Sequence, residues 1–417
     1  AAGLATGLTG CGESSDGTVN LTFQIWDVAQ RDGMQAMCDA YTAQHPNVKI
    51  EVQVTSWNEY WTKLEAAAMS NKMPDIFWMH TNEILKYADN GKLADCSDIV
   101  DTEHFSDISL ANASGSDGKL YGVPKDKDTV GLVYNKEMFD AAGVAYPDET
   151  WTWDDLVSAS QAIYDATGKY GYMAYGDDQL GYWNFVYQAG GSILTEDGSA
   201  YNMTDPKTVD AIQKLSDLIN VYHVTPDPLT SSTSNMSVTA ALQSKQVAVI
   251  CDGTWTNLDL SSIDINYDVA CLPDMGSEHC FETTASACVI FNSTEHPQEA
   301  WDFMMYLCDP ANALDLYSSG LWMPIMQAWY DDAELLSKWA DPETTSHTAG
   351  FHDSAVNYTA YSYRLAPESC VVGWAKLDAI IESALDSVWL GEATAQDALT
   401  EISTPVNALV EGFITFK

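Results

Sequence analysis

Alternating apolar and polar positions predict two β-strands near the start of the chain, over Leu21–Trp26 and Val48–Thr55. Between them, apolar side chains recur at steps of three and four residues from Met34 to Tyr41, which is the stripe of an amphipathic helix. His45-Pro46 ends this helix, because the residue before a proline avoids helical geometry. The chain therefore begins with the strand, helix and strand of a parallel α/β unit with right-handed crossovers.

This alternation of strand and helix continues along the chain. A helix over about residues 58–69 precedes a short buried strand at Asp75–Met79. The next helix runs from Glu83 to Asn90 and is ended by Gly91, which is suited to a left-handed cap. The later pattern predicts strands over 130–134 and 247–251 and helices over 153–166, 209–222, 239–245, 377–388 and 395–406.

The first three predicted strands end in aromatic and hydrogen-bonding side chains. These ends are Trp26-Asp27, Ser56-Trp57 and His80-Thr81-Asn82. In open α/β sheets, ligands bind beyond the carboxyl ends of parallel strands. The periodicity alone therefore predicts a candidate binding site at these residues.

Length and charge narrow the class of protein. The chain has 417 residues, 46% of them apolar, which is more than a single hydrophobic core usually organises, so we expect two lobes. Its 18 basic and 60 acidic side chains give a formal charge of −42, which excludes nucleic acid as a partner and argues against docking on anionic lipid. Arg31 and Arg364 are the only arginines, so bidentate recognition of several phosphates is not expected.

The first residues resemble the processing site of an exported lipoprotein. The motif Leu8–Cys11 (LTGC) matches a lipobox, in which a peptidase cleaves before the cysteine and the thiol receives a diacylglycerol. Residues 12–18 are small and polar, as in a flexible tether. We interpret residues 1–18 as a truncated signal peptide, the lipobox and the tether, with Cys11 as the lipidation site. The alternative is an ordinary surface cysteine near a frayed terminus.

The remaining cysteines lie in apolar segments without a repeated spacing. They are Cys38, Cys96, Cys251, Cys271, Cys280, Cys288, Cys308 and Cys370. A chain of this length does not need disulfides for stability, so we expect mostly free, buried thiols and an anaerobic setting. Pairing is the alternative in an exported protein. Glu278-His279-Cys280 lacks the companion ligands of a zinc site, and neither a metal nor a cofactor is expected.

Motifs of common enzyme classes are absent from the sequence. No phosphate-binding loop (GxxxxGK[ST]), nucleophile elbow (GxSxG) or zinc helix (HExxH) occurs. Acidic residues are so numerous that most of them must belong to a solvated surface. A pair of carboxylates therefore gives no argument for a glycosidase.

Aromatic residues are more informative. The chain has 14 tryptophans and 21 tyrosines, more than a core of this size ordinarily needs. The apolar faces of a pyranose stack on such rings, while carboxylates and amides bind its hydroxyls; core packing is the alternative role for each ring. The tryptophans at loop-like positions are Trp57, Trp78, Trp183, Trp255, Trp322 and Trp374.

A series of short motifs occurs in a characteristic order through nearly the whole chain. They include Phe23–Trp26, His45–Ile50, Met73–His80, Gly118–Pro124, Leu132–Phe139, Gly190-Gly191, Gln246–Val249, Gly253–Trp255 and Glu299–Phe303. In these motifs the chain resembles the extracellular solute-binding proteins of ATP-driven carbohydrate importers, the family that includes maltose-binding protein. Each motif alone is weak, and their shared order carries the resemblance.

The resemblance implies an α/β, two-lobed periplasmic-binding-protein-like fold (type II), with discontinuous lobes joined by hinge strands. Lobe one would comprise residues 19–127 and 283–320, and lobe two residues 128–282 and 321–417. The chain would cross between the lobes near residues 127–131, 282–286 and 318–323. Closure about these hinges would bury a ligand in the cleft, and the closed form is what a permease would recognise.

The resemblance also implies ligand-binding residues. It places Trp78, His80, Thr81, Asn82, Asp128, Asp178, Trp183, Trp255 and Trp374 at the cleft. Strand ends and loop positions add Asp27, Gln30, Trp57, Asp252 and Trp322. No catalytic residue is implied, because capture and delivery alter no covalent bond.

We therefore predict a lipid-anchored monomer on the extracellular face of the membrane of a Gram-positive bacterium. It would capture a mono- or oligosaccharide and deliver it to the permease subunits of an ABC transporter. One alternative is a receptor for a cationic small molecule such as a polyamine, since an acidic cleft with aromatic rings could hold an ammonium group. A glycoside hydrolase is the other alternative.

Overall fold

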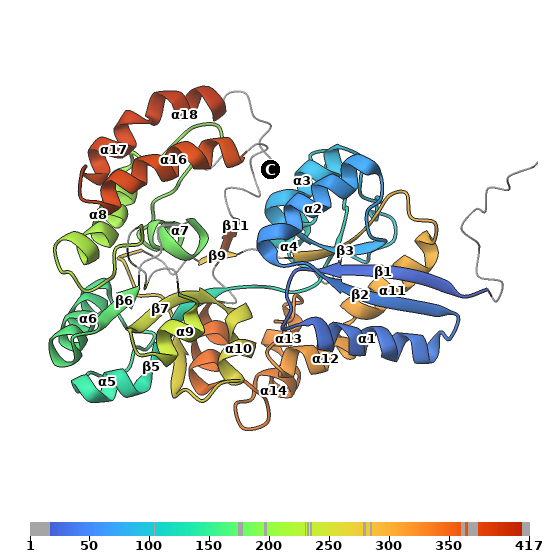
Figure 1. Cartoon of the computed structure of the whole chain (residues 1–417), viewed down its shortest axis with the longest axis horizontal. Helices are drawn as coiled ribbons and strands as arrows, with labels where there is room; N and C mark the ends of the chain where they lie inside the picture. Colours follow the sequence, from blue (N-terminus) through green and yellow to red (C-terminus); the bar gives the residue numbers. More distant parts are fainter. Residues whose placement is uncertain are drawn as a thin grey trace, which may run out of the picture.

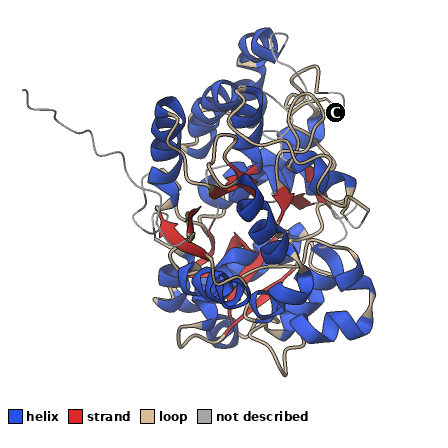
Figure 2. Cartoon of the chain, turned by 90° about the vertical axis from the view of Figure 1, so that its right-hand side faces the viewer, coloured by secondary structure: helices blue, strands red, loops and turns tan. Residues whose placement is uncertain are grey.

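The computed structural model places two groups of strands and helices side by side, and helices surround the strands of each group (Figures 1 and 2). We call the group that contains the N-terminal strands the first unit and the other group the second unit. The structure describes residues 17–103, 105–173, 178–195, 198–229, 231, 233, 236–277, 281–283, 286–359, 363–365 and 374–410.

The first unit is built on a five-stranded sheet. Its strand order is β2 (Val48–Val54), β1 (Val19–Ile25), β3 (Ile76–His80), β10 (Ser286–Ile290) and β4 (Val123–Pro124). β1 runs parallel to β2, with Val19 opposite Val48, and parallel to β3, with Phe23 opposite Ile76. β10 is antiparallel to both β3 and β4. The three strands predicted from the N-terminal pattern are confirmed.

The helices of the first unit cover this sheet. They are α1 (Arg31–Gln44), α2 (Trp57–Ser70), α3 (Thr81–Asp89), α4 (Asp107–Asn112), α11 (Pro297–Cys308), α12 (Pro310–Ser318), α13 (Ala328–Asp331) and α14 (Ala333–Ala340). β2, at the edge of the sheet, alternates buried and exposed residues, whereas all five residues of β3 are buried. A strand covered on both faces reads as a continuous apolar run, which explains the sequence of β3.

The second unit is built on a four-stranded sheet in the order β6 (Tyr170–Met173), β7 (Val247–Gly253), β5 (Val130–Asn135) and β8 (Tyr267–Ala270). β6 is parallel to β7, and β5 is antiparallel to both β7 and β8. A separate parallel pair joins β9 (Phe281–Thr283) to β11 (Tyr363–Leu365).

The other helical segments lie with the second sheet. They are α5 (Lys136–Ala142), α6 (Trp153–Thr167), η1 (Asp178–Tyr182), α7 (Trp183–Gln188), α8 (Pro206–Asn220), α9 (Val238–Gln243), η2 (Thr254–Thr256), α10 (Asn257–Ser261), η3 (Phe351–Thr359), α16 (Trp374–Trp389), α17 (Ala395–Glu401) and α18 (Ser403–Val410). Local signals fix several ends. Thr152 and Asp155 form a capping box before α6, and Gly168 ends that helix in the left-handed conformation.

Each unit has its own hydrophobic core. Phe23 and Phe77 belong to the first core, and Leu132 and Leu377 belong to the second. Buried side chains within residues 322–356 belong to the first core, although the sequence analysis assigns residues 321–417 to lobe two. η3 also packs on β5 and β8. This stretch therefore contacts both units, and the exact lobe boundaries remain a prediction.

The chain crosses from the first sheet to the second over residues 125–129, between β4 and β5. Lys127 N donates to Met323 O at 3.2 Å, and Thr254 N donates to Thr129 O at 3.0 Å. The chain returns between β8 and β10, within residues 271–285. These two crossings overlap the segments 127–131 and 282–286 that the sequence analysis assigns to hinges.

The described cysteines are buried free thiols, as the sequence analysis expects. They are Cys38, Cys96, Cys251, Cys271, Cys288 and Cys308. Cys11, Cys280 and Cys370 lie outside the described residues. Within the described ranges, no helix combines the length and apolar character that crossing a bilayer requires.

Replacing Gly171 with alanine tests how closely β6 packs on α6. A Cβ at this position would lie 2.2 Å from Ser160 Cα and 2.6 Å from Ser160 O, and backbone atoms cannot turn aside as a side chain can. We expect Gly171→Ala to reduce the free energy of unfolding by about 1–3 kcal/mol, measured from the midpoint of urea denaturation. A midpoint equal to that of the wild type would show that strand and helix are not in such close contact.

Candidate ligand-binding cleft

A cleft of about 1020 Å³ lies between the two units. The first unit contributes Trp26, Asp27, Val28, Gln30, Val54, Ser56, Trp57, Trp78, His80, Asn82, Ser286 and Leu321 to its lining. The second unit contributes Leu180, Trp255, Trp374 and Asp378, and the crossing segment contributes Lys125, Asp126 and Asp128. Aromatic rings therefore reach the cleft from both units, and acidic side chains accompany them.

The parallel strands of the first unit bring their carboxyl ends to the cleft. Trp26 follows β1, Ser56 follows β2, and His80 is the last residue of β3. Because β1 pairs with both β2 and β3 in parallel, these three ends lie at the same edge of the sheet. The sequence periodicity predicts this edge as a binding site, and the structure places a cleft there.

Trp26 is the centre of an aromatic cluster on the wall of the first unit. Its ring lies edge-on to Trp57 and Tyr60, each with a centroid separation of 5.3 Å, and to Trp78 at 5.1 Å. Trp57 is 41% exposed, while Trp78 is completely buried behind it. Each edge-on pair contributes about 0.5–1.5 kcal/mol beyond the area that it buries. The wall is therefore rigid, apolar and open to a ligand at Trp57.

A chain of hydrogen bonds fixes the polar loop that follows β1. Gln30 Nε2 donates to Asp27 Oδ2 at 2.9 Å, and Trp322 Nε1 donates to Gln30 Oε1 at 2.9 Å. Ala29 N donates to Asp27 Oδ1 at 2.8 Å. Both carboxylate oxygens of Asp27 thus already accept a hydrogen bond, which holds this side chain in place at the rim.

The crossing segment carries a buried ion pair at the floor of the cleft. Lys125 forms a salt bridge with Asp126, and both side chains are buried. The Lys125 ammonium also lies over two aromatic faces, 4.3 Å from the ring centroid of Trp78 and 4.6 Å from that of Trp322. Asp126 Oδ1 is buried and has no hydrogen-bond partner among the described residues. One acceptor at the floor of the cleft is therefore unsatisfied.

Asp128 follows on the same segment and is partly exposed. Burial, followed by repulsion from Asp126, raises the pKa of Asp128 to about 8, while Lys125 and a hydrogen bond from Thr254 act in the opposite direction. The cleft floor therefore resists a further negative charge.

His80 is a neutral polar group at the end of β3. Burial, together with the charge of Lys125, lowers its pKa to about 4, and the contact with Asn82 opposes this shift. Its Nδ1 lies 2.8 Å from Asn82 Oδ1. The ring is therefore uncharged near neutral pH, and the two side chains hold each other at the start of α3.

The opposite wall presents Trp255, whose ring lies against the backbone of Gly253. A Cβ at Gly253 would lie 2.1 Å from Trp255 Cη2 and 2.1 Å from its Cζ3. The carboxyl of Asp252 accepts hydrogen bonds from Gly253 N, at 2.6 Å, and from the side chains of Thr256 and Trp255. Burial raises the pKa of Asp252 to about 7. Asp252 thus orients the Trp255 ring from below.

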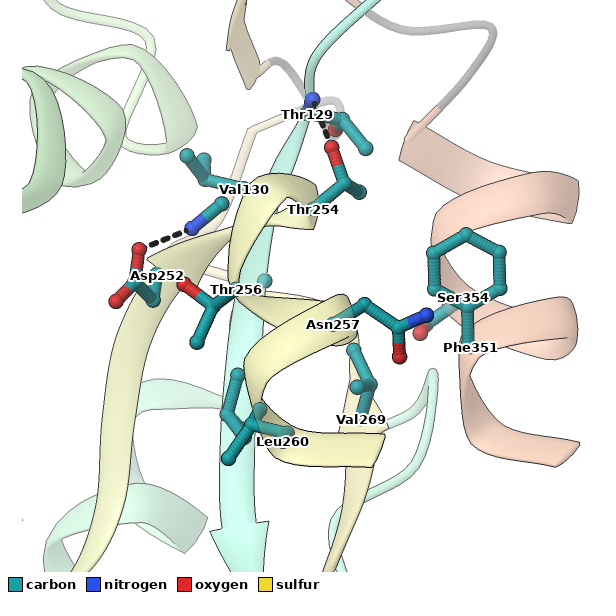
Figure 3. A pocket seen from close by; sticks show the side chains of 13 residues that line it. Thr129, Val130, Asp252, Thr254, Thr256, Asn257, Leu260, Val269, Phe351 and Ser354 are labelled. Carbon is teal, nitrogen blue, oxygen red and sulfur yellow. Dashed lines mark hydrogen bonds between the residues drawn. The ribbon is translucent and has the colours of Figure 1, made fainter. Parts of the chain in front are cut away.

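Asp252 itself lines a separate small cavity of about 20 Å³ under the crossing segment. Figure 3 shows Asp252 on one side of this cavity, with Thr129 and Thr254 above it and Phe351 of η3 opposite. This cavity is far smaller than a sugar ring, so it belongs to the support of the cleft wall.

α16 completes the wall of the second unit. Trp374 is its first residue, and Asp378 follows one turn later on the same helical face. The Trp374 ring contacts Trp183 edge-on at 5.6 Å. Trp374 Nε1 is a buried donor without a hydrogen-bond partner among the described residues, and the same holds for Trp78 Nε1 on the opposite wall.

These groups are suited to binding an uncharged or cationic guest. Within the described residues, no group of three or more histidine, cysteine, aspartate or glutamate side chains could hold a metal ion. The lining offers aromatic faces, unsatisfied donors and an unsatisfied acceptor.

Comparison with known proteins decides the family. The profile of the bacterial extracellular solute-binding proteins matches residues 36–345, which is well over half of the chain. The chain belongs to this family.

Related proteins agree with this assignment. The solute-binding protein has a fold similar to that of the ABC substrate-binding protein Lmo0181 from Listeria monocytogenes in complex with cycloalternan, with a TM-score of 0.81, 22% identity and coverage of 94% of this chain and 99% of that chain. The fold is also similar to that of the GacH receptor of Streptomyces glaucescens, with a TM-score of 0.80, 21% identity and coverage of 94% of this chain and 99% of that chain. The maltodextrin-binding protein MdxE of Bacillus subtilis is 23% identical over 327 residues, 75% of this chain and 76% of its own. The two-lobed fold of the solute-binding protein is therefore established.

The cleft brings together most of the residues that the sequence analysis singles out. Those on its lining are Asp27, Gln30, Trp57, Trp78, His80, Asn82, Asp128, Trp255 and Trp374. Their role in binding remains a prediction.

Four predicted residues lie behind the cleft lining of the solute-binding protein. Thr81 is buried and donates to Asn112 Oδ1 at 2.6 Å, because it begins α3 on its inner side. Trp183 is fully buried in the second core, where it supports Trp374. Trp322 and Asp252 position Gln30 and Trp255, respectively. The backbone of Asp178 begins η1, and its side chain lies outside the described residues.

The sequence analysis missed several lining residues. Lys125 and Asp126 directly precede the predicted crossing, so their position beside a hinge was the available signal. Trp26 is one of the strand ends at which the periodicity predicts a binding site, but the list of ligand-binding residues omits it. Asp378 had no signal beyond its place four residues after Trp374, because carboxylates are too common in this chain to be informative.

Gly253→Ala tests the support of the Trp255 ring. The added methyl group would overlap the ring, so we expect Trp255 to be displaced into the cleft and its fluorescence maximum to shift. The free energy of unfolding should fall by about 1–3 kcal/mol. The same substitution in a Trp255→Ala background is the control, because the obstructing ring is then gone and the added loss of stability should be small. An equal loss in both backgrounds would contradict the contact.

Proposed function

We propose that this solute-binding protein captures a carbohydrate between its two lobes and delivers it to the permease subunits of an ABC importer. The observation that carries the proposal is the cleft itself, which places exposed or partly exposed tryptophans on both walls around unsatisfied polar atoms. A sugar ring has apolar faces and a polar edge, and it needs both kinds of contact at once.

The aromatic faces support a ligand with flat apolar surfaces. Trp57 from the first unit and Trp255 from the second line the same cleft. Both rings are held by their neighbours, Trp57 by Trp26 and Trp255 by Asp252. A preorganised ring stacks on a ligand without losing further conformational freedom.

The unsatisfied polar atoms support a ligand rich in hydroxyl groups. Trp78 Nε1 and Trp374 Nε1 are donors, and Asp126 Oδ1 is an acceptor. A hydroxyl group can accept from the first kind and donate to the second. Leaving such a group unpaired costs about 1–3 kcal/mol, so a guest that satisfies them gains affinity and specificity.

The size of the cleft supports an oligosaccharide. Its volume of about 1020 Å³ is at the upper limit of about 1,000 Å³ for pockets that hold drug-sized ligands. Of the proteins described above, Lmo0181 was solved in complex with cycloalternan, and MdxE is named as a maltodextrin-binding protein.

Closure would couple binding to delivery. A ligand that contacts both Trp57 and Trp255 stabilises the arrangement in which the two walls approach each other. The crossing at residues 125–129 is a short connection about which the two units would rotate. We propose that no covalent step takes place. A monomer would suffice, because both walls come from one chain.

A carbohydrate screen tests the proposed function. Thermal-shift measurements against neutral mono- and oligosaccharides, followed by calorimetry on each hit, should find at least one ligand. Trp255→Ala should weaken its binding by about 10- to 100-fold. Tyr164→Ala, at a partly exposed ring on α6 that does not line the cleft, is the matched control and should bind as the wild type does. If no sugar raises the melting temperature, or if reducing ends are released during incubation, pure carbohydrate capture is wrong.

We also propose that Cys11 anchors the protein by a lipid to the extracellular face of the membrane of a Gram-positive bacterium. Residues 1–16 lie outside the described structure, so the support comes from the lipobox motif and from the extracellular family. Labelled palmitate should be incorporated into the precursor in a Gram-positive host, and Cys11→Ala should abolish both labelling and membrane retention. Ser14→Ala, in the tether, is the control. Retention of Cys11→Ala on washed membranes would contradict the anchor.

A further inference from the structure

Carboxylates outnumber basic groups in the lining of the cleft. Asp27, Asp126, Asp128 and Asp378 line it, and Lys125 is the one lysine or arginine among the described lining residues. Lys125 is already paired with Asp126. When this pair is set aside, the carboxyl groups of Asp27, Asp128 and Asp378 remain in the lining.

Two of the four lining carboxyl groups lie on the crossing segment. Asp126 is only 4% exposed, lines the cleft, and keeps one oxygen, Oδ1, without a partner among the described residues. Asp128 lies two residues further along and lines the same cleft. A buried acceptor beside a second carboxyl group can accept hydrogen bonds from a guest, and a positively charged donor would in addition favour ionisation of that second carboxyl.

The aromatic surroundings also accept a cation. The Lys125 ammonium lies over the rings of Trp78 and Trp322, at 4.3 and 4.6 Å from their centroids. The protein thus already stabilises one ammonium group by ring faces together with a carboxylate. Trp57 and Trp255 offer further ring faces on the two walls.

We propose that the carbohydrate carries a protonated amino group, and that Asp128, together with the buried Oδ1 of Asp126, binds this group at the floor of the cleft. This inference rests on the proposed function, since it names the chemical class of the captured sugar. The ammonium replaces one sugar hydroxyl and donates to the two carboxylates, while the rest of the glycan stacks on the tryptophans.

The state of Asp128 agrees with this placement. Burial and the neighbouring Asp126 raise the pKa of its carboxyl to about 8, so a negative charge is disfavoured there in the empty protein. A bound ammonium group supplies the missing positive charge and favours the ionised carboxylate. A neutral sugar offers no such compensation.

A glycan with one amine fits better than a simple polyamine. A polyamine would use the carboxylates, but it would leave the donors Trp78 Nε1 and Trp374 Nε1 unsatisfied, because a protonated amine cannot accept a hydrogen bond. An amino sugar satisfies both the donors, through its hydroxyl oxygens, and the carboxylates.

Matched ligands test the inference. Calorimetry at slightly acidic pH should compare glucosamine disaccharides of several linkages with the glucose disaccharides of the same linkages, which differ by hydroxyl groups in place of ammonium groups. Spermidine, a polyamine without sugar rings, is the third ligand in the comparison. We expect an amino sugar to bind about tenfold or more tightly than its neutral counterpart, and we expect this preference to shrink as salt is added.

Two variants of the protein test where the amino group of the sugar binds. In Asp128→Asn the preference for the amino sugar should fall to near one, because the side chain keeps its size and loses its charge. Asp154→Asn, at an exposed position in the first turn of α6, removes the same charge far from the lining and should keep the preference. A preference that survives in Asp128→Asn would overturn the placement of the amine.

The outcomes separate this inference from the proposed function. If neutral sugars bind as tightly as amino sugars or more tightly, the inference is wrong and carbohydrate capture stands. If spermidine binds and no sugar does, or if no member of the set binds, both are wrong. Tight, salt-sensitive binding of an amino sugar that depends on Asp128 supports both.

Discussion

The cleft depends on the parallel hydrogen bonding of β1 with β2 and β3. Because these strands run in one direction, the connections that follow them all lie at the same edge of the sheet. The helices α1, α2 and α3 begin near that edge. The strand ends supply Trp26, Ser56 and His80 to one wall. A register shift of one residue would turn the inward-facing side chains of β1 and β2 toward solvent, so the buried core and the position of the wall are fixed by the same pairing.

The crossing between the units imposes a second constraint. Its residues must join two sheets, and they also carry the buried charges Lys125 and Asp126 and the partly exposed Asp128. Charge in such a place is costly unless it is paired, and the raised pKa of Asp128 reflects that cost. The free-energy cost of an unpaired charge is greatest in the cleft, where a bound ligand would exclude water. The crossing is thus the place where the connection between the two units and the charged groups of the cleft floor coincide.

Several features of the site are supported from a layer behind the lining. Trp322 donates to Gln30, Asp252 accepts from Trp255, and Trp183 packs against Trp374. These supporting side chains fix the orientation of groups that face the cleft, which lowers the entropy that binding must remove. Their replacement would change affinity without removing a contact to the ligand.

The sequence by itself determined the alternation of strands and helices, the family and the edge of the first sheet at which the cleft lies. Periodicity suffices for the strands, the helices and the sheet edge, because burial on one face leaves a repeating pattern and because parallel strands must end together. The family follows instead from the shared order of short motifs. It could not separate Trp57 and Trp255, which line the cleft, from Trp183, which lies in the core, because all three side chains have the same chemistry. It also gave no reason to choose Asp378 among 60 acidic residues, and it marked Asp126 only by its position beside the predicted crossing. Only the tertiary structure decided these points, since burial and the absence of a partner depend on segments that are distant in the sequence and meet only when the chain has folded.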